Sequence, residues 1–145
     1  MRIKLVYLLP VLLLVLTCSS NVRPKPDIYK TLAGNTQGSW KYEKSYTDTD
    51  GSKVRFLVYL VFRLPNVYRW RTSGTRNYKD DPSLSYTEEG TFEVNEEEKT
   101  ITFTPNEGDP WTVTYEFLQG SDNLKITKSD GEVYEFVWVI TYLWS

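Results

Sequence analysis

The chain has 145 residues, a length that suits one ordinary domain. Its 17 Lys and Arg residues against 19 Asp and Glu residues give a net charge of −2, which argues against nucleic-acid binding because that function needs a clustered basic surface. The sequence holds no His and one Cys, which excludes an intramolecular disulfide, the usual His-containing catalytic triads and most zinc sites.

Residues 1–17 predict an export signal. Arg2 and Lys4 form a short basic start, and an apolar run over 5–16 follows, interrupted only by Pro10. This run is too short for an ordinary membrane-spanning helix, which needs about 20 apolar residues. We therefore expect 1–17 to be a signal peptide.

Residues 15–18, Val-Leu-Thr-Cys, resemble the lipobox of bacterial lipoproteins, with Thr17 in place of the commoner Gly, Ala or Ser. The resemblance implies cleavage after Thr17 and a lipid-modified Cys18 that anchors the protein to a membrane of the bacterial cell envelope. Ser19 stands where some of these lipoproteins carry an Asp that retains them at the inner membrane, which favours the outer membrane. The alternative is a plain secreted protein whose Cys lies here by chance.

Residues 18–37 predict a flexible tether behind the lipidated Cys. The segment shows no hydrophobic periodicity, and its two prolines favour extended backbone. Near its end, residues 27–32 predict one helical turn that Asp27 caps and that ends near Gly34.

Residues 38–145 predict one all-β domain. Apolar and polar side chains alternate with a period of two, and polar turns separate the runs. Eight hairpin-connected strands favour an antiparallel up-and-down barrel, because closure removes both exposed sheet edges. A two-sheet β-sandwich is the alternative, since periodicity alone cannot show closure. The expected strands lie around 40–42, 54–62, 68–72, 90–94, 101–103, 111–117, 124–126 and 134–140, with a long polar loop over 73–83.

Aromatic side chains dominate the inner face that this alternation predicts. An eight-stranded barrel has room only for its own side chains or one small ligand. We expect a closed end packed around Trp40 and, at the other end, at most a shallow apolar pocket of about a few hundred Å³. The predicted inward set is Trp40, Tyr42, Phe56, Phe62, Tyr68, Trp70, Phe92, Phe103, Trp111, Tyr115, Phe117, Tyr134, Phe136 and Trp138.

The run Gly38-Ser39-Trp40 resembles the Gly-x-Trp motif of lipocalins, and residues 90–94 and 100–103 resemble strands of small bacterial lipocalin-like lipoproteins. The resemblance implies a calycin-type barrel of eight strands in which Trp40 packs at the closed end. Lipocalins often place an Arg on the last strands over that Trp, whereas residues 132–145 hold no Arg or Lys. Either another residue covers Trp40, or the barrel closes differently.

The candidate ligand-binding residues are inward Tyr and Trp side chains, whose hydroxyl and indole groups need polar partners when buried. We expect these groups to gather at the wetter, open end, where a small planar or amphipathic ligand could bind. The set is Tyr68, Trp70, Trp111, Tyr115 and Tyr134.

The sequence predicts no catalytic set, no metal site and no cofactor. Asp48 and Asp50 resemble the start of a calcium loop, but Tyr59 stands at its twelfth position, so a hairpin turn is expected. Glu88 and Glu89 are adjacent and point to opposite faces of a strand, so they cannot form a facing catalytic pair. We do not expect an enzyme.

Two functions remain open. The first is a membrane-anchored module that binds a small apolar ligand, as many lipocalins do. The second is a non-catalytic protein-interaction module, of the inhibitor or surface-adhesion type, with the barrel as scaffold. The predicted outer face carries an apolar stripe for which a terminal segment (28–32 or 142–144) or a partner protein is the expected cover. The stripe comprises Leu57, Tyr59, Val61, Val133, Val137 and Val139. Near the stripe, four arginines on the outer face predict a solvated surface with ion pairs. They are Arg55, Arg63, Arg69 and Arg71.

Overall fold

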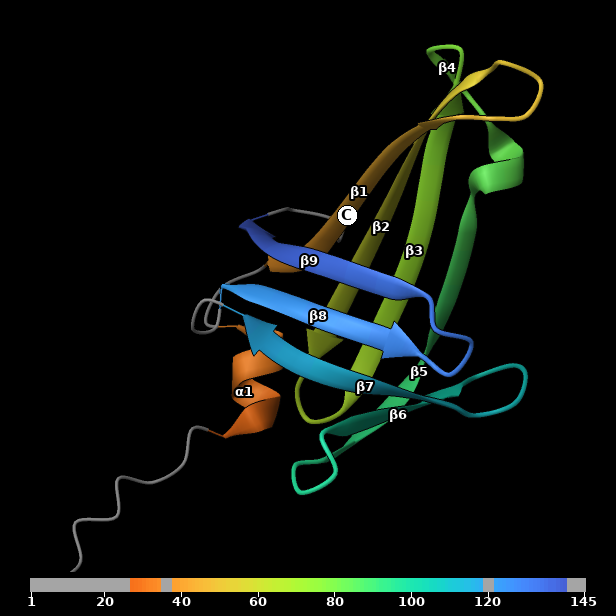
Figure 1. Cartoon of the computed structure of the whole chain (residues 1–145). Helices are drawn as coiled ribbons and strands as arrows, with labels where there is room; N and C mark the ends of the chain where they lie inside the picture. Colours follow the sequence, from red (N-terminus) through yellow and green to blue (C-terminus); the bar gives the residue numbers. More distant parts are fainter. Residues whose placement is uncertain (1–26, 35–37, 119–121, 141–145) are drawn as a thin grey trace, which may run out of the picture.

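The computed structural model describes residues 27–34, 38–118 and 122–140, and in these ranges the chain forms a closed antiparallel β-barrel (Figure 1). Eight strands make the ring and one short strand, β4, lies outside it. No helix in the described ranges is both long and apolar enough to cross a membrane. The elements are α1 (Ile28–Ala33), β1 (Gly38–Thr47), β2 (Lys53–Arg63), β3 (Val67–Arg76), β4 (Lys79–Asp80), the 3₁₀ turn η1 (Pro82–Leu84), β5 (Tyr86–Asn95), β6 (Thr100–Pro105), β7 (Trp111–Leu118), β8 (Asn123–Lys128) and β9 (Val133–Ile140).

The ring closes because β1, the first strand, pairs with β9, the last strand. All remaining pairs in the ring join strands that follow one another along the chain, apart from the short β4. β3 pairs directly with β5, which leaves β4 as a short extension of β3. The predicted up-and-down barrel is therefore confirmed, and the two-sheet sandwich is wrong. All of these pairings lie within residues 38–140, so the barrel is complete without the segment that precedes α1.

The interior is aromatic, as the alternation predicts. All fourteen aromatic residues that the sequence places inward belong to a single core cluster, nine of them buried and five partly buried. Along each strand the outward neighbours of these residues are mostly exposed or half-buried. The pleat of the strands thus sorts the side chains into a packed lumen and a polar outer surface.

The barrel is closed at one end by α1 and Trp40. The Trp40 indole Nε1 donates a hydrogen bond of 2.9 Å to the Leu32 carbonyl, and both side chains are almost fully buried. Trp138 packs edge-to-face on Trp40, with 5.1 Å between ring centroids. Trp138 therefore lies where the lipocalin resemblance implies an Arg.

Trp138 also explains the first glycine of the Gly-x-Trp motif. A Cβ added to Gly38 would lie 2.4 Å from Cζ2 of Trp138, and one added to Gly34 would lie at the same distance. Two glycines thus give the Trp138 ring the space to reach Trp40.

The short helix predicted near the N-terminal side of the barrel is confirmed as α1, and the Asp27 carboxylate caps it by accepting from the Tyr29 N–H at 3.1 Å. The expectation that 28–32 covers the outer apolar stripe is wrong, because Leu32 is fully buried and α1 packs against the interior cluster. The barrel end that α1 closes offers this helix both apolar contact and the Trp40 N–H donor. The alternative cover, residues 142–144, lies outside the described residues.

The end of the barrel opposite α1 holds four connections, namely β1–β2, β3–β5, β6–β7 and β8–β9 (Figure 1). The prediction of a long polar loop over 73–83, which lies at this end, is partly wrong. β3 continues to Arg76 and turns back into β4 through Asn77 and Tyr78, which both have positive φ. The Arg76 guanidinium holds this hairpin by ion pairs with Asp48 at 2.7 Å and Asp81 at 3.0 Å. A hairpin that projects beyond the core has two polar faces, so no apolar alternation marks it in the sequence.

Candidate binding site at the open end of the barrel

Four of the five predicted site residues meet inside the barrel: Trp111 and Tyr134 lie near the strand ends opposite α1, whereas Tyr68 lies near the α1-side start of β3 and reaches them with its ring and hydroxyl. Tyr68 and Trp70 come from β3, Trp111 begins β7 and Tyr134 lies near the start of β9. Trp70 packs edge-to-face on Trp111 and on Tyr134, with ring centroids 5.7 Å and 5.3 Å apart. Trp111 in turn stacks on Phe103, which contacts Tyr68. The strand register that fixes the inner face therefore also assembles this group.

A carboxylate lies among these rings. The Tyr68 hydroxyl and the Trp111 indole N–H both donate to Oε1 of Glu88, at 2.6 Å and 3.0 Å, and the Tyr86 hydroxyl donates to Oε2 at 2.9 Å. All three donors are neutral. Burial, followed by the hydrogen bond to Glu88, raises the pKa of Tyr68, and the same carboxylate raises the pKa of Tyr86.

Glu88 points inward because it pairs with Trp70 across β3 and β5 and shares the inner face with Gly90 and Phe92. Glu89 points outward and forms an ion pair with Arg69. The prediction that the two glutamates lie on opposite faces is confirmed. Glu88 was not among the predicted site residues, although counting back by two from Gly90 places it inside.

Lys128 is the second charged residue that sequence reasoning missed. Its ammonium lies over three rings, 5.6 Å from the centroid of Trp70, 5.9 Å from Trp111 and 5.1 Å from Tyr134. We name Trp70, Trp111 and Tyr134 the aromatic cage. The same ammonium donates to the Tyr134 hydroxyl at 3.4 Å and pairs with Glu132 at 3.2 Å. Continuing the inward positions 124 and 126 by two residues identifies Lys128, which the expected strand 124–126 did not include.

Two surface hollows open at this end of the barrel. One of about 380 Å³ lies beside Glu88 and is also lined by Tyr86, Thr87, Glu89, Asn106 and Glu107. The other, of about 500 Å³, lies between the projecting hairpins and is lined in part by Tyr46, Val54 and Tyr78. Both are open to solvent, whereas the α1 end is packed around Trp40.

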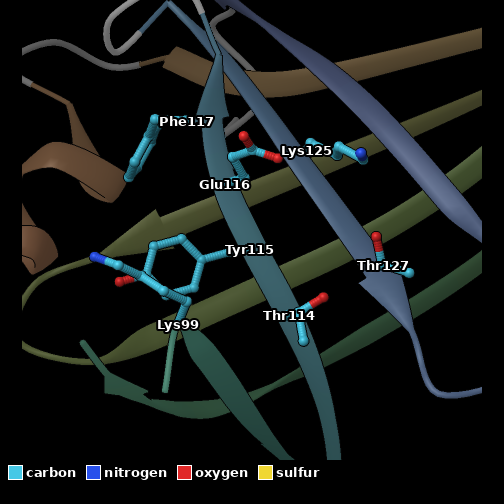
Figure 2. Close-up of a pocket in the computed structure, with 7 residues that line it drawn as sticks. All are labelled: Lys99, Thr114, Tyr115, Glu116, Phe117, Lys125 and Thr127. Atoms are coloured by element: carbon cyan, nitrogen blue, oxygen red, sulfur yellow. The ribbon is translucent and has the colours of Figure 1, made fainter. Parts of the chain in front are cut away.

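Tyr115 does not join the other four candidates, so its predicted place at the open end is wrong. It lies four residues beyond Trp111 on β7, a distance of roughly 13 Å along a strand, toward the α1 end. There it belongs to a hollow of about 650 Å³ beside β7 and β8. Figure 2 shows Tyr115 and Phe117 on one side of the β7 ribbon, with Lys99 next to the Tyr115 ring, and Lys125 and Thr127 on the other side.

The Tyr115 hydroxyl is buried and has no hydrogen-bond partner among the described residues. Burial is the main reason why the pKa of Tyr115 is raised. The outward residues that line the hollow are polar, but none of them forms a hydrogen bond with the Tyr115 hydroxyl.

The described part of the chain contains no group of three His, Cys, Asp or Glu side chains that could hold a metal ion. Asp48 and Asp50 belong to the β1–β2 turn, as expected, and their carboxylates accept from backbone N–H groups of that turn. The Arg76 guanidinium beside Asp48 lowers the pKa of that carboxyl. These contacts are those of a structural turn.

The outer arginines also lie as predicted. Arg55 pairs with Glu43 at 2.7 Å, and Arg69 pairs with Glu89. The apolar stripe is uneven, because Val61 is buried while Val133 and Val137 are 41% and 52% exposed.

Comparisons with known proteins add the following. No family model matches the chain, and no curated protein sequence matches it. Among solved structures, a de novo designed fluorescence-activating β-barrel aligns over 75% of this chain and 94% of its own length, with 18% sequence identity and a TM-score of 0.36. At that TM-score the likeness says nothing about what this chain binds.

Proposed function

We propose that this chain is a non-catalytic binding protein, which takes a small amphipathic molecule at the open end of its barrel and is held at a bacterial envelope membrane through lipidated Cys18. The observation that carries the proposal is the convergence of Glu88, Lys128 and the aromatic cage inside one end of an otherwise apolar lumen. Both charged groups are partly buried and keep polar partners, so the mouth combines charge and aromatic surface in a way that suits an amphipathic ligand.

The rest of the lumen limits the size of the ligand. The α1 end is filled by Trp40, Trp138 and Leu32, and the aromatic core continues from there toward the cage. The hollows of about 380 and 500 Å³ lie at the mouth, and a ligand of that size is expected to bind there. A short apolar chain with one polar head group fits that space better than a molecule that must be wholly enclosed.

The proposed anchor agrees with the placement of the described domain. The lipobox resemblance puts the lipid on Cys18, and the chain enters the barrel through α1 at its closed end (Figure 1). An attachment on that side leaves the open end accessible. Two or three acyl chains on one residue suffice for stable membrane attachment.

Titration with a fluorescent fatty-acid analogue tests whether the open end binds amphiphiles at all. We expect saturable binding at micromolar concentration. Trp111→Phe removes the indole N–H that Glu88 accepts and shrinks the cage, so it should weaken binding about fivefold or more. Trp138→Phe, at the closed end, is the matched control and should bind as the unmodified chain does. Absence of saturable binding to this probe, and to the head-group series described below, contradicts the proposal.

A protein-interaction surface is a second candidate, because Val133 and Val137 are exposed on the outer face of β9. A photo-crosslinking residue at position 137, in cells that produce the protein, should then yield one specific adduct. The same residue at position 116, on the outer face of β7, serves as the control. Equal adducts from both positions argue against this surface.

A further inference from the structure

We propose that the aromatic cage, with Glu88 beside it, is a site for an organic ammonium group, and that Lys128 is an internal occupant which such a ligand displaces. This inference rests on the proposed function, because the cage lies inside the same open end. It goes further by naming the chemical class of the head group.

The geometry of the cage is that of a cation site. Trp70 packs nearly perpendicular to both Trp111 and Tyr134, at 85° and 88°, and all three rings lie around one point, the position of the Lys128 ammonium. An ammonium group already lies there, between 5.1 and 5.9 Å from each ring centroid. Aromatic faces attract cations within about 6 Å, and methylated ammonium groups are especially suited because their hydration is weak.

The charges next to the cage also favour a cation. Glu88 hydrogen-bonds to Trp111 of the cage, yet in the described ranges no Lys or Arg forms an ion pair with it. The hollow beside Glu88 is lined by two further glutamates, Glu107 and Glu89, of which Glu89 is paired with Arg69, and its described lining includes no basic residue. A recess lined by carboxylates has a negative potential that concentrates cations.

Lys128 can leave the cage without losing its ion pair. Its side chain is 30% exposed, and Glu132, its acidic partner across the β8–β9 turn, is 51% exposed. The four-carbon stem of a lysine is flexible, so the ammonium can swing outward while it stays near Glu132. A ligand that carries its own cation would then take over the contacts with the three rings.

The test compares three amphiphiles with the same twelve-carbon chain and different head groups: trimethylammonium, carboxylate and neutral maltoside. Binding to the chain from Ser19 to Ser145, which contains every strand pairing, is followed calorimetrically below the micellar concentrations. We expect the trimethylammonium compound to bind about tenfold more tightly than the carboxylate, a difference of about 1.4 kcal/mol.

Two pairs of variants make the assignment specific. Lys128→Ala empties the cage and removes a like charge, so it should tighten binding of the trimethylammonium compound about tenfold, whereas Lys125→Ala, outward on the same strand, should leave it unchanged. Glu88→Gln keeps an oxygen acceptor for Tyr68 and Trp111 but removes the charge, so it should weaken that binding about tenfold. Glu93→Gln, at an exposed outward position farther along the same strand, is its control. Thermal unfolding followed by circular dichroism checks that each variant is folded.

The outcomes separate this inference from the proposed function. If the carboxylate binds as tightly or more tightly, and Lys128→Ala weakens its binding, then Lys128 is an anion site, and the ammonium assignment is wrong while the binding function stands. If Lys128→Ala leaves trimethylammonium binding unchanged, displacement is wrong. If none of the three amphiphiles binds, both the inference and the proposed function are contradicted.

Discussion

The Trp40 indole N–H and the Leu32 carbonyl are joined by a buried hydrogen bond of 2.9 Å, which ties the barrel wall to the helix that closes it. Trp40→Ala should therefore be among the most costly substitutions, lowering the free energy of unfolding by about 3–5 kcal/mol. Trp40→Phe keeps most of the apolar contact but leaves the Leu32 carbonyl unpaired, for which we expect a loss of about 1–3 kcal/mol. Urea unfolding measures both. A loss below about 1 kcal/mol for the alanine variant would show that Trp40 does not hold the closed end.

The contact between Gly38 and Trp138 gives a second stability prediction. Gly38→Ala places a methyl group in the position occupied by the Trp138 ring, so we expect a loss of about 1–3 kcal/mol. In a Trp138→Leu background the ring is gone, and the cost of the same glycine substitution should fall. A double-mutant cycle by urea unfolding measures this coupling. Equal costs in the two backgrounds would mean that the glycine is needed for another reason.

Much of this fold could be predicted because the signal comes from burial. Where one strand face is packed and the other is wet, apolar residues recur at every second position, and the inward aromatics follow directly from that period. The projecting β3–β4 hairpin lacks such a signal, since ion pairs of Arg76 and not apolar burial hold it. Closure of the ring depends on pairing between β1 and β9, which are far apart in the sequence, so periodicity could not decide it.

The site was harder to predict than the fold. Four aromatic residues that meet inside the barrel were predicted to lie together because burial of a Tyr or Trp implies a polar partner. Glu88 was considered only as a catalytic partner of Glu89, and Lys128 was assigned to neither face, because charged residues are usually solvated and seldom point into a barrel. The inward direction of Glu88 and Lys128 follows from the strand register. It can be derived from the sequence when the alternation of inward and outward residues is continued to the strand ends.

Glu88 should matter for stability more than its neighbour. Glu88→Ala leaves the Tyr68 hydroxyl and the Trp111 indole N–H without their acceptor, so we expect a loss of about 1–3 kcal/mol. Glu89→Ala breaks an ion pair on the outer surface, which should cost at most about 1 kcal/mol. Chemical unfolding of the two variants side by side measures the difference. The reverse order would contradict the inward placement of Glu88.

Alkaline pH should destabilise the folded chain through its buried tyrosines. Burial raises the pKa of Tyr68 and of Tyr134, and the hydrogen bond to Glu88 adds to the effect at Tyr68. In the unfolded chain these groups ionise near pH 10. Their contribution to stability is therefore fully present below about pH 10 and is lost as the pH rises further, because only the unfolded chain can then release the protons.

Urea unfolding at about pH 8 and about pH 11, on either side of the ordinary tyrosine pKa, measures this loss. Tyr68→Phe removes one of the responsible groups, so its free energy of unfolding should fall less between the two pH values. Tyr78→Phe is the control, since Tyr78 is 80% exposed, and it should behave as the unmodified chain. Identical pH dependence in all three would rule out Tyr68 as a source of the effect.

The proposed membrane anchor has a direct chemical test. Cells that produce the chain should incorporate radiolabelled palmitate into it, and Cys18→Ser should abolish both the label and the association with membranes. No other Cys is present to take the lipid. Continued labelling of the serine variant would contradict lipidation at Cys18.

The central claim, that the open end of the barrel takes an amphipathic ligand, is tested most directly by the tryptophan indole N–H signals in a ¹⁵N–¹H NMR spectrum. The chain is titrated in parallel with dodecyltrimethylammonium and with dodecanoate, and Trp→Phe variants assign the signals. We expect saturable shifts of the Trp70 and Trp111 signals with at least one probe, while the Trp40 signal at the closed end stays in place. Shifts confined to Trp40 and Trp138, or no shift with either probe, would contradict it.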